Sequence, residues 1–106
     1  MSTPYIHDEY FDALRGRGLL ADIEKMAHSR RDLIEVDTSP TDTGWKVEVR
    51  TASGTYRILR SQDKLHLAVE RDGTVVRGKD YQCREDGLVE ASIDLLTALV
   101  RGAPRK

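Results

Sequence analysis

The sequence predicts an α+β fold with an N-terminal helical segment, a five-stranded antiparallel meander sheet and a C-terminal helix packed on one face of the sheet. Three observations predict this class. Apolar residues recur at helical spacing near both ends of the chain, they alternate with polar residues in the middle, and short turn signals separate the alternating runs. With 106 residues and 39% hydrophobic content, the chain is expected to form a single compact domain over 1–106.

The first third of the chain predicts two short helices. Thr3-Pro4 suits a helix start, because threonine can cap free N–H groups and proline tolerates the first helical position. An apolar stripe with steps of four then indicates a helix over 4–15. Gly16 and Gly18 interrupt the pattern, which resumes over 19–28. We therefore expect two helices joined at the glycines.

The middle of the chain has the period of two that strands require. Turn signals at Ser53-Gly54, Gln62-Asp63 and Asp72-Gly73 divide it into consecutive antiparallel strands. The polar segment 38–44 ends the first of them. Residues 79–84 can extend or bulge the last one. The predicted strands cover 33–37, 45–50, 56–60, 64–70 and 74–78.

The last element is predicted to be a helix that begins at an Asp86 cap and stops at Gly102 and Pro104. Its apolar stripe is wide enough to cover one face of the sheet, and residues 103–106 form a tail. The stripe contains Val89, Ile93, Leu96 and Val100, with Leu88, Leu95 and Leu99 alongside.

Two-residue turns allow the strand register to be counted from the sequence, and the count places apolar residues together on one face. It pairs Thr51 with Tyr56, Val49 with Ile58, Ile58 with Leu67, Tyr56 with Val69, and Val69 with Val76. The same count puts Arg50, Arg57, Ala68 and Arg77 in one row of the other face. Glu48, Leu59, His66 and Lys79 form the next row.

The predicted outer face is therefore rich in basic residues and has only Glu48 and Glu70 as acidic ones. The helices carry seven acidic residues: Asp8, Glu9, Asp12, Asp22, Glu24, Glu90 and Asp94. Like charges opposite each other destabilise a sheet, so Arg50 beside Arg57 invites a functional explanation. We expect a non-enzymatic protein-binding module of the adaptor, inhibitor or immunity type that docks on an acidic protein. The plain alternative is a solvated face that keeps the sheet soluble. The candidate partner-binding residues are Arg50, Arg57, Leu59, His66, Arg77 and Lys79.

A second hypothesis places a small-ligand or anion pocket between the sheet and the helices. Trp45, Tyr56 and Arg60 all point to the inner face in the predicted register. A buried guanidinium needs a partner, which an anion could provide. Alternatively, Arg60 is a rim residue whose stem packs while its head reaches water or an aspartate.

A nucleic-acid accessory role is a third hypothesis, and the aromatic residues disfavour it. Sheet-type readers of single strands stack bases on exposed aromatic side chains, but here the predicted outer face has none. Asparagine, a reader of adenine edges, does not occur, and the net charge is −1. Self-association as a homodimer is also compatible with an uncovered sheet.

No residue pattern predicts a catalytic centre, a metal site or a cofactor. The sequence Gly16-x-Gly18-x-x-Ala21 resembles a dinucleotide-binding loop but follows a predicted helix instead of a strand. Cys83, the only cysteine, has no histidine placed to assist it. One cysteine and the absence of an apolar run long enough to span a membrane favour a cytoplasmic protein. Twelve arginines against five lysines suggest a GC-rich bacterial or phage gene.

Overall fold

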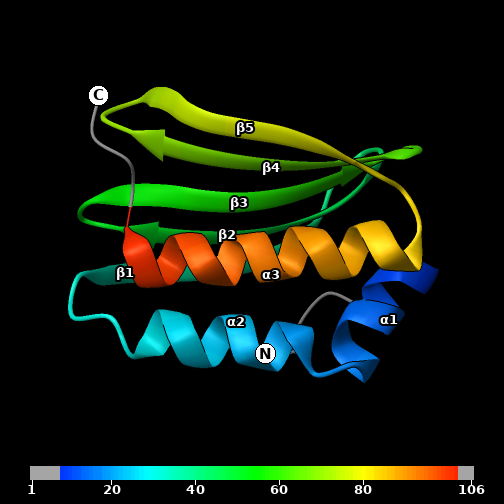
Figure 1. Cartoon of the computed structure of the whole chain (residues 1–106), viewed down its shortest axis with the longest axis horizontal. Helices are drawn as coiled ribbons and strands as arrows, with labels where there is room; N and C mark the ends of the chain where they lie inside the picture. Colours follow the sequence, from blue (N-terminus) through cyan, green and yellow to red (C-terminus); the bar gives the residue numbers. More distant parts are fainter. Residues whose placement is uncertain (1–7, 103–106) are drawn as a thin grey trace.

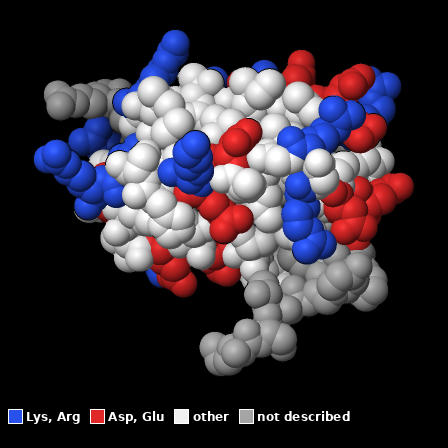
Figure 2. All heavy atoms as spheres, turned by 90° about the horizontal axis from the view of Figure 1, so that it is seen from below, with Lys and Arg blue, Asp and Glu red and all other residues white. Residues whose placement is uncertain are grey.

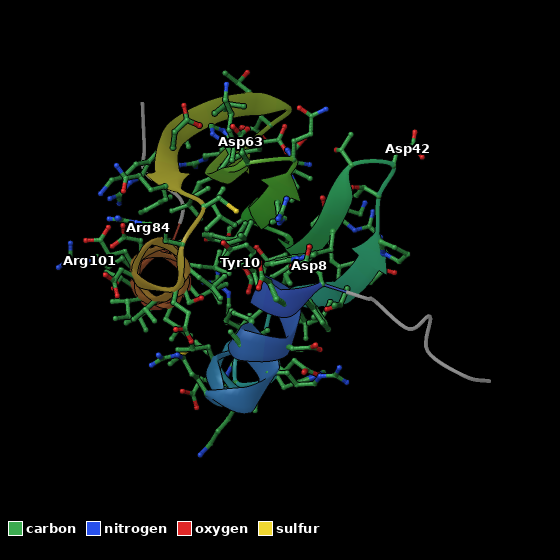
Figure 3. All side chains as sticks on the ribbon, turned by 90° about the vertical axis from the view of Figure 1, so that its right-hand side faces the viewer. Asp8, Tyr10, Asp42, Asp63, Arg84 and Arg101 are labelled. Atoms are coloured by element: carbon green, nitrogen blue, oxygen red, sulfur yellow. The ribbon has the colours of Figure 1, made fainter. Side chains whose placement is uncertain are left out.

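The computed structural model describes residues 8–102 and confirms the α+β class. Two helices come first, then five strands, then a long helix. In Figures 1 and 3 the sheet curves around the helices, which all lie on one of its faces. The elements are α1 (Glu9–Gly16), α2 (Leu19–His28), β1 (Leu33–Pro40), β2 (Gly44–Thr51), β3 (Gly54–Ser61), β4 (Lys64–Arg71), β5 (Thr74–Gln82) and α3 (Glu85–Arg101).

The sheet is an antiparallel meander in the order β1-β2-β3-β4-β5, as predicted. The register between β3 and β4 is also confirmed, with Ile58 opposite Leu67 and Tyr56 opposite Val69. The predicted register between β2 and β3 is wrong by two residues, because Val49 lies opposite Tyr56. A shift of two leaves every side chain on its predicted face but gives it a different neighbour.

The shift arises because the hairpin between β2 and β3 turns at Ala52 and Ser53, one residue earlier than predicted. Thr51 lies opposite Gly54, and its Oγ1 accepts from the Gly54 N–H (3.1 Å) and donates to the Gly54 carbonyl (2.7 Å). The Ala52 N–H donates to the carbonyl of Asp32 at 2.9 Å. These bonds outweigh the turn preference of the Ser53-Gly54 dipeptide.

A β-bulge in β5 shows that the predicted positions of Arg77 and Lys79 in the two outer rows are wrong. Glu70 still lies opposite Val75, but Val69 lies opposite Arg77 instead of Val76. A bulge adds one residue to one strand, so every later residue of β5 changes face. Strand β5 continues to Gln82, which places Tyr81 opposite Leu65 on the inner face, where it is buried.

The helix ends differ from the predicted ones in two places. Helix α1 is capped by Asp8, whose Oδ1 accepts from the N–H groups of Tyr10 (2.9 Å) and Phe11 (3.1 Å). The predicted start at Thr3-Pro4 falls outside the described residues, and the extended backbone of Asp8 rules out one helix over 4–15. Helix α3 starts at Glu85, so Asp86 lies in its first turn and is not its cap.

The core lies between the sheet and the helices and is one continuous cluster. Helix α3 covers β3, β4 and β5, while α2 contacts β1 and α3. Small residues let α3 approach closely, and Gly87, Ala91 and Ser92 are all buried. The largest fully buried side chains are Trp45, Tyr56, Leu14, Ile23, Ile58, Leu65, Leu67, Leu88, Leu95, Leu99, Val47 and Val49.

Candidate functional site

The outer sheet face is a ladder of ion pairs and not the basic surface that the sequence predicts. Arg57 lies between two acidic neighbours, with Nη1 3.0 Å from Glu48 and Nη2 2.9 Å from Glu70. The corrected register produces this arrangement, because Glu48 is directly opposite Arg57 and Thr55 is opposite Arg50. Arg50 and Arg57 are therefore not a like-charge pair, and their predicted alignment is wrong.

Three other cations of this face also have acidic partners on neighbouring strands, whereas Lys64 at the start of β4 has none among the described residues. Arg50 pairs with Glu35, and Lys46 Nζ lies 3.5 Å from Asp37. His66 Nδ1 lies 2.6 Å from Asp80. Leu59, half-buried, remains on this face between Lys46 and His66. The acidic residues of β1 and β5, which the predicted rows omitted, thus balance the charge of the face.

The bulge moves Arg77 and Lys79 from the outer face to the helical side. Lys79 Nζ lies 3.6 Å from Asp94 of α3 and 4.9 Å from the centre of the Tyr81 ring. The Tyr81 hydroxyl donates to Asp94, and burial together with this bond raises the pKa of Tyr81. The six residues predicted to bind a partner therefore do not share one surface.

The predicted ligand residues are divided between two regions of the inner face. Trp45 and Arg60 are direct neighbours across β2 and β3, but Tyr56 lies four residues before Arg60 in β3. Trp45 packs edge-on against Phe11, with ring centres 5.4 Å apart. Trp45 and Tyr56 are both fully buried. Neither the indole Nε1 nor the Tyr56 hydroxyl has a hydrogen-bond partner among the residues that the structure describes.

Arg60 reaches an aspartate, as expected if it is a rim residue and not part of an anion pocket. Its Nε lies 3.3 Å from Oδ2 of Asp8, and both side chains are only 15% exposed. The guanidinium also lies 5.2 Å from the centre of the Tyr10 ring. Figure 3 shows Asp8 and Tyr10 between α3 and the sheet at this end of the molecule. Asp8 thus neutralises the charge that an anionic ligand would have met.

Cys83 lies at the same end and is half-buried. Burial raises the pKa of its thiol, and the negative charge of Asp8 adds to the rise, although Arg60 opposes it. A raised pKa keeps the sulfur protonated near neutral pH, where a thiol is a weak nucleophile.

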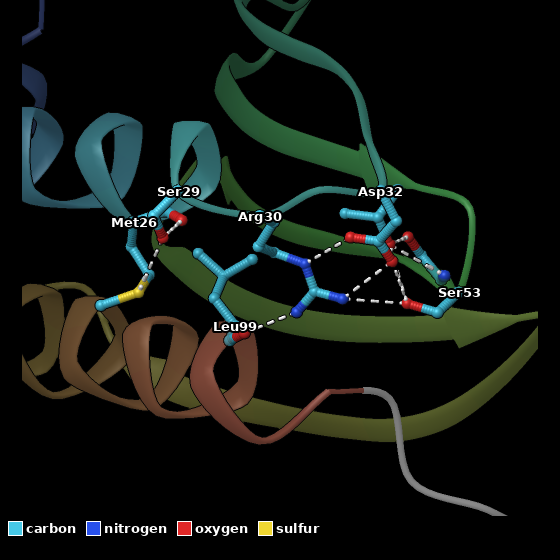
Figure 4. A network of polar contacts seen from close by, with 8 residues as sticks. Met26, Ser29, Arg30, Asp32, Ser53 and Leu99 are labelled. Atoms are coloured by element: carbon cyan, nitrogen blue, oxygen red, sulfur yellow. Dashed lines mark hydrogen bonds and ion pairs between the residues drawn. The ribbon is translucent and has the colours of Figure 1, made fainter.

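Arg30 organises the opposite end of the sheet through the polar contacts drawn in Figure 4. Its guanidinium also lies 5.4 Å from the centre of the Tyr56 ring. It donates to both carboxylate oxygens of Asp32 at 2.9 and 3.0 Å. It also donates to Ser53 at 2.9 Å and to the carbonyl of Leu99 at 2.5 Å. One guanidinium thus joins the end of α3, the start of β1 and the turn between β2 and β3.

This network is structural, because all of its charges have partners inside the fold. Hydrogen bonds from Arg30 and Ser53 lower the pKa of Asp32, so the carboxylate stays ionised near neutral pH. The Leu99 bond satisfies a carbonyl in the last turn of α3, a position that favours a cation. Two loops and a helix end are thereby fixed relative to one another.

Two adjoining hollows beside this network form what we call the α2–α3 groove. The first measures about 370 Å³ and the second about 490 Å³, and they share Met26 and Ser29. Leu96, Leu99 and Val100 supply the apolar wall from α3. The polar residues that line the groove are Asp22, Lys25, Ser29, Arg30, Arg31, Asp32 and Arg101, together with Gly102.

Three cations of this groove have no ion pair within residues 8–102. Lys25, Arg31 and Arg101 are all exposed. Figure 2 shows blue side chains standing out at the left-hand end, where α2 and α3 finish in Figure 1, and mixed charges at the right-hand end. Lys25, Arg31 and Arg101 thus bring basic charge without an internal partner to the helix ends.

Sequence reasoning missed this groove because it assigned the wrong stripe of α3 to the sheet. Leu88, Leu95 and Leu99 are buried, whereas Ile93 is 51% and Val100 66% exposed. The sequence contained a signal for the correct face, because the small residues Gly87, Ala91 and Ser92 lie among these leucines. Small side chains allow a helix face to approach a sheet closely.

Comparison with protein families, with curated proteins and with solved structures finds no match to this chain. Within residues 8–102, no group of three or more His, Cys, Asp or Glu side chains is arranged to hold a metal ion. The helices of that part of the chain are all too short or too polar to cross a membrane.

Proposed function

We propose that the protein is a small non-enzymatic binding module that docks an acidic segment of a protein partner in the α2–α3 groove. The observation that carries this proposal is the position of three cations without ion pairs in the described chain, Lys25, Arg31 and Arg101, on the lining of one partly apolar groove. Arg50, Arg57 and Lys46 on the sheet are neutralised by neighbouring carboxylates, whereas Lys25 and Arg31 have no such partner in the described chain. Cations without an internal partner can attract one from outside.

The groove has the composition of a peptide-binding surface. Met26 offers a flexible, polarizable side chain, and Leu96 and Val100 provide apolar contact area. Exposed cations lie at its rim, where they can steer an acidic partner without being desolvated. A partner segment with apolar residues flanked by Asp or Glu satisfies both features.

The test uses the immobilised protein, a cell extract and two matched double variants. Lys25→Glu with Arg31→Glu reverses two unpaired cations at the groove. Lys64→Glu with Arg84→Glu reverses two exposed cations that lack ion pairs among the described residues at the other end of the molecule. We expect the wild type and the second variant to retain the same acidic protein, identified by mass spectrometry, and the first variant to lose it.

Titration calorimetry with that protein should then show at least a tenfold weaker affinity for the groove variant and a loss of affinity with added salt. The proposal is wrong if the groove variant binds as tightly as the wild type, or if both variants lose the partner equally.

A further inference from the structure

Helix α3 carries an apolar stripe that the described chain leaves partly uncovered. The stripe consists of Val89, Ile93, Leu96 and Val100, at successive spacings of four, three and four residues. These spacings keep all four side chains on one side of a helix. Ile93 is 51% and Val100 66% exposed, and Val89 and Leu96 are half-buried. Leu96 and Val100 of this stripe also line the α2–α3 groove.

From this stripe we infer that two copies of the chain associate through α3 in an antiparallel, two-fold symmetric dimer. The spacing is palindromic, because the point midway between Ile93 and Leu96 is also midway between Val89 and Val100. A two-fold axis at that point places Val89 against Val100 of the second copy and Ile93 against Leu96. An isologous interface requires such self-complementarity.

The charges beside the stripe select the antiparallel orientation. Glu90 and Arg101 are separated by eleven residues, about three helical turns, so they lie on the same side of the stripe. Both are exposed, and neither has an ion pair within the described residues. In the antiparallel dimer each Arg101 lies beside Glu90 of the other copy. In a parallel dimer Glu90 and Arg101 of the two copies lie about three turns apart along the helices and cannot pair.

The sheet edges are poor alternatives for self-association. Strand β1 is interrupted by the irregularity at Ile34 and ends at Pro40. Strand β5 is bulged at Val76. Bulges, prolines and charges are devices that prevent strands from pairing edge to edge. The exposed apolar stripe of α3 is therefore the better self-association surface.

The inference rests on the proposed function in one respect, since the second copy occupies the edge of the same groove and an acidic partner would compete with it. One helix face per copy is a small interface, so we expect dissociation at micromolar concentrations.

Sedimentation velocity from about 10 to 300 µM tests the dimer in the concentration range expected of a small interface. We expect the wild type to convert from monomer to dimer, and Ile93→Glu to stay monomeric. Val75→Glu is the matched control, because Val75 is 53% exposed on β5, far from α3 in sequence. It should dimerise like the wild type. Circular dichroism should show that all three proteins are folded.

A charge exchange tests the orientation. Arg101→Glu should weaken dimerisation at least tenfold in low salt, and adding Glu90→Arg to the same chain should restore it. A wild type that remains monomeric over the whole range overturns the dimer. So does a Val75→Glu variant as disruptive as Ile93→Glu. If the wild type is monomeric but still captures a partner through Lys25 and Arg31, only the dimer is lost. If it dimerises without capturing one, only the proposed function is lost.

Discussion

Arg57 illustrates how one side chain can look functional in a sequence and be structural in the fold. Counting from the turns placed it opposite another arginine, an arrangement that would call for an external anion. The corrected register places it between Glu48 and Glu70, at 3.0 and 2.9 Å. Its guanidinium thus links β2, β3 and β4, and its charge is neutralised within the sheet.

Substitutions at Arg57 should therefore change stability more than binding. We expect Arg57→Glu to place three acidic side chains in adjacent strands and to lower the free energy of unfolding by about 2 kcal/mol. Urea denaturation measures this loss. Arg57→Gln, which keeps a donor, should cost about 1 kcal/mol. A fully stable Arg57→Glu variant would contradict the ion-pair ladder.

Asp32 should make the protein sensitive to acid. Its folded pKa lies below the ordinary value of 3.8, so the folded state binds fewer protons than the unfolded chain as the pH falls through 3.8. The stabilisation is therefore complete near neutral pH and is lost progressively below about pH 4. Asp32→Asn should lower the free energy of unfolding at pH 7 by about 1–2 kcal/mol and flatten its fall towards pH 3.

Urea denaturation at pH 7 and pH 3 measures both effects. Asp42→Asn is the control, because Asp42 is exposed in the loop after β1 and has no ion pair within residues 8–102. It should behave like the wild type at both pH values. An Asp32→Asn variant with the acid response of the wild type would count against the role of the Arg30 network.

At the scale of elements, the contact between α3 and β5 depends on a glycine. A Cβ on Gly87 would lie 2.0 Å from the carbonyl oxygen of Gln82, and backbone cannot rotate away as a side chain can. Gly87→Ala should therefore cost about 2–4 kcal/mol and move the start of α3. Thermal unfolding measures the loss. Gly16→Ala is the control: its Cβ would meet nothing within 4 Å, and alanine favours α1 by about 0.5 kcal/mol.

The element types, their order and the strand faces could be predicted from the sequence, whereas the neighbours across the sheet could not. Faces follow from the strict alternation of side chains, which survives a register shift of two residues. The hairpin between β2 and β3 was misplaced because the Ala52 N–H in its turn donates to the carbonyl of Asp32, which lies twenty residues earlier in the chain. No local pattern contains such a contact.

The bulge in β5 left a signal that the sequence pattern could have revealed. Val76 packs against the core and Tyr81 is buried in it, yet five residues separate them. In a regular strand an odd separation puts two side chains on opposite faces. Both can face inward only if one residue is inserted between them, and that insertion carries Arg77 and Lys79 to the helical side.

For the whole molecule, the sequence predicted a basic sheet opposite acidic helices, and the fold distributes charge differently. Acidic residues of the edge strands β1 and β5, including Glu35 and Asp80, meet the cations of the central strands. Among the described cations without an ion pair, Lys25, Arg31 and Arg101 lie where α2 and α3 end. Since this balance depends on the register of five strands at once, composition and spacing alone could not predict the candidate site.

If α3 pairs with its copy, the stability of the whole molecule should depend on protein concentration. Only the folded chain presents the stripe, so the dimer stabilises the native state by mass action. Raising the concentration a hundredfold, from about 5 to 500 µM, should raise the wild-type Tm by about 3–5 °C. Scanning calorimetry should show the same rise for Val75→Glu and a constant Tm for Ile93→Glu. Because an unpaired monomer unfolds at a temperature independent of its concentration, a constant wild-type Tm would contradict the dimer.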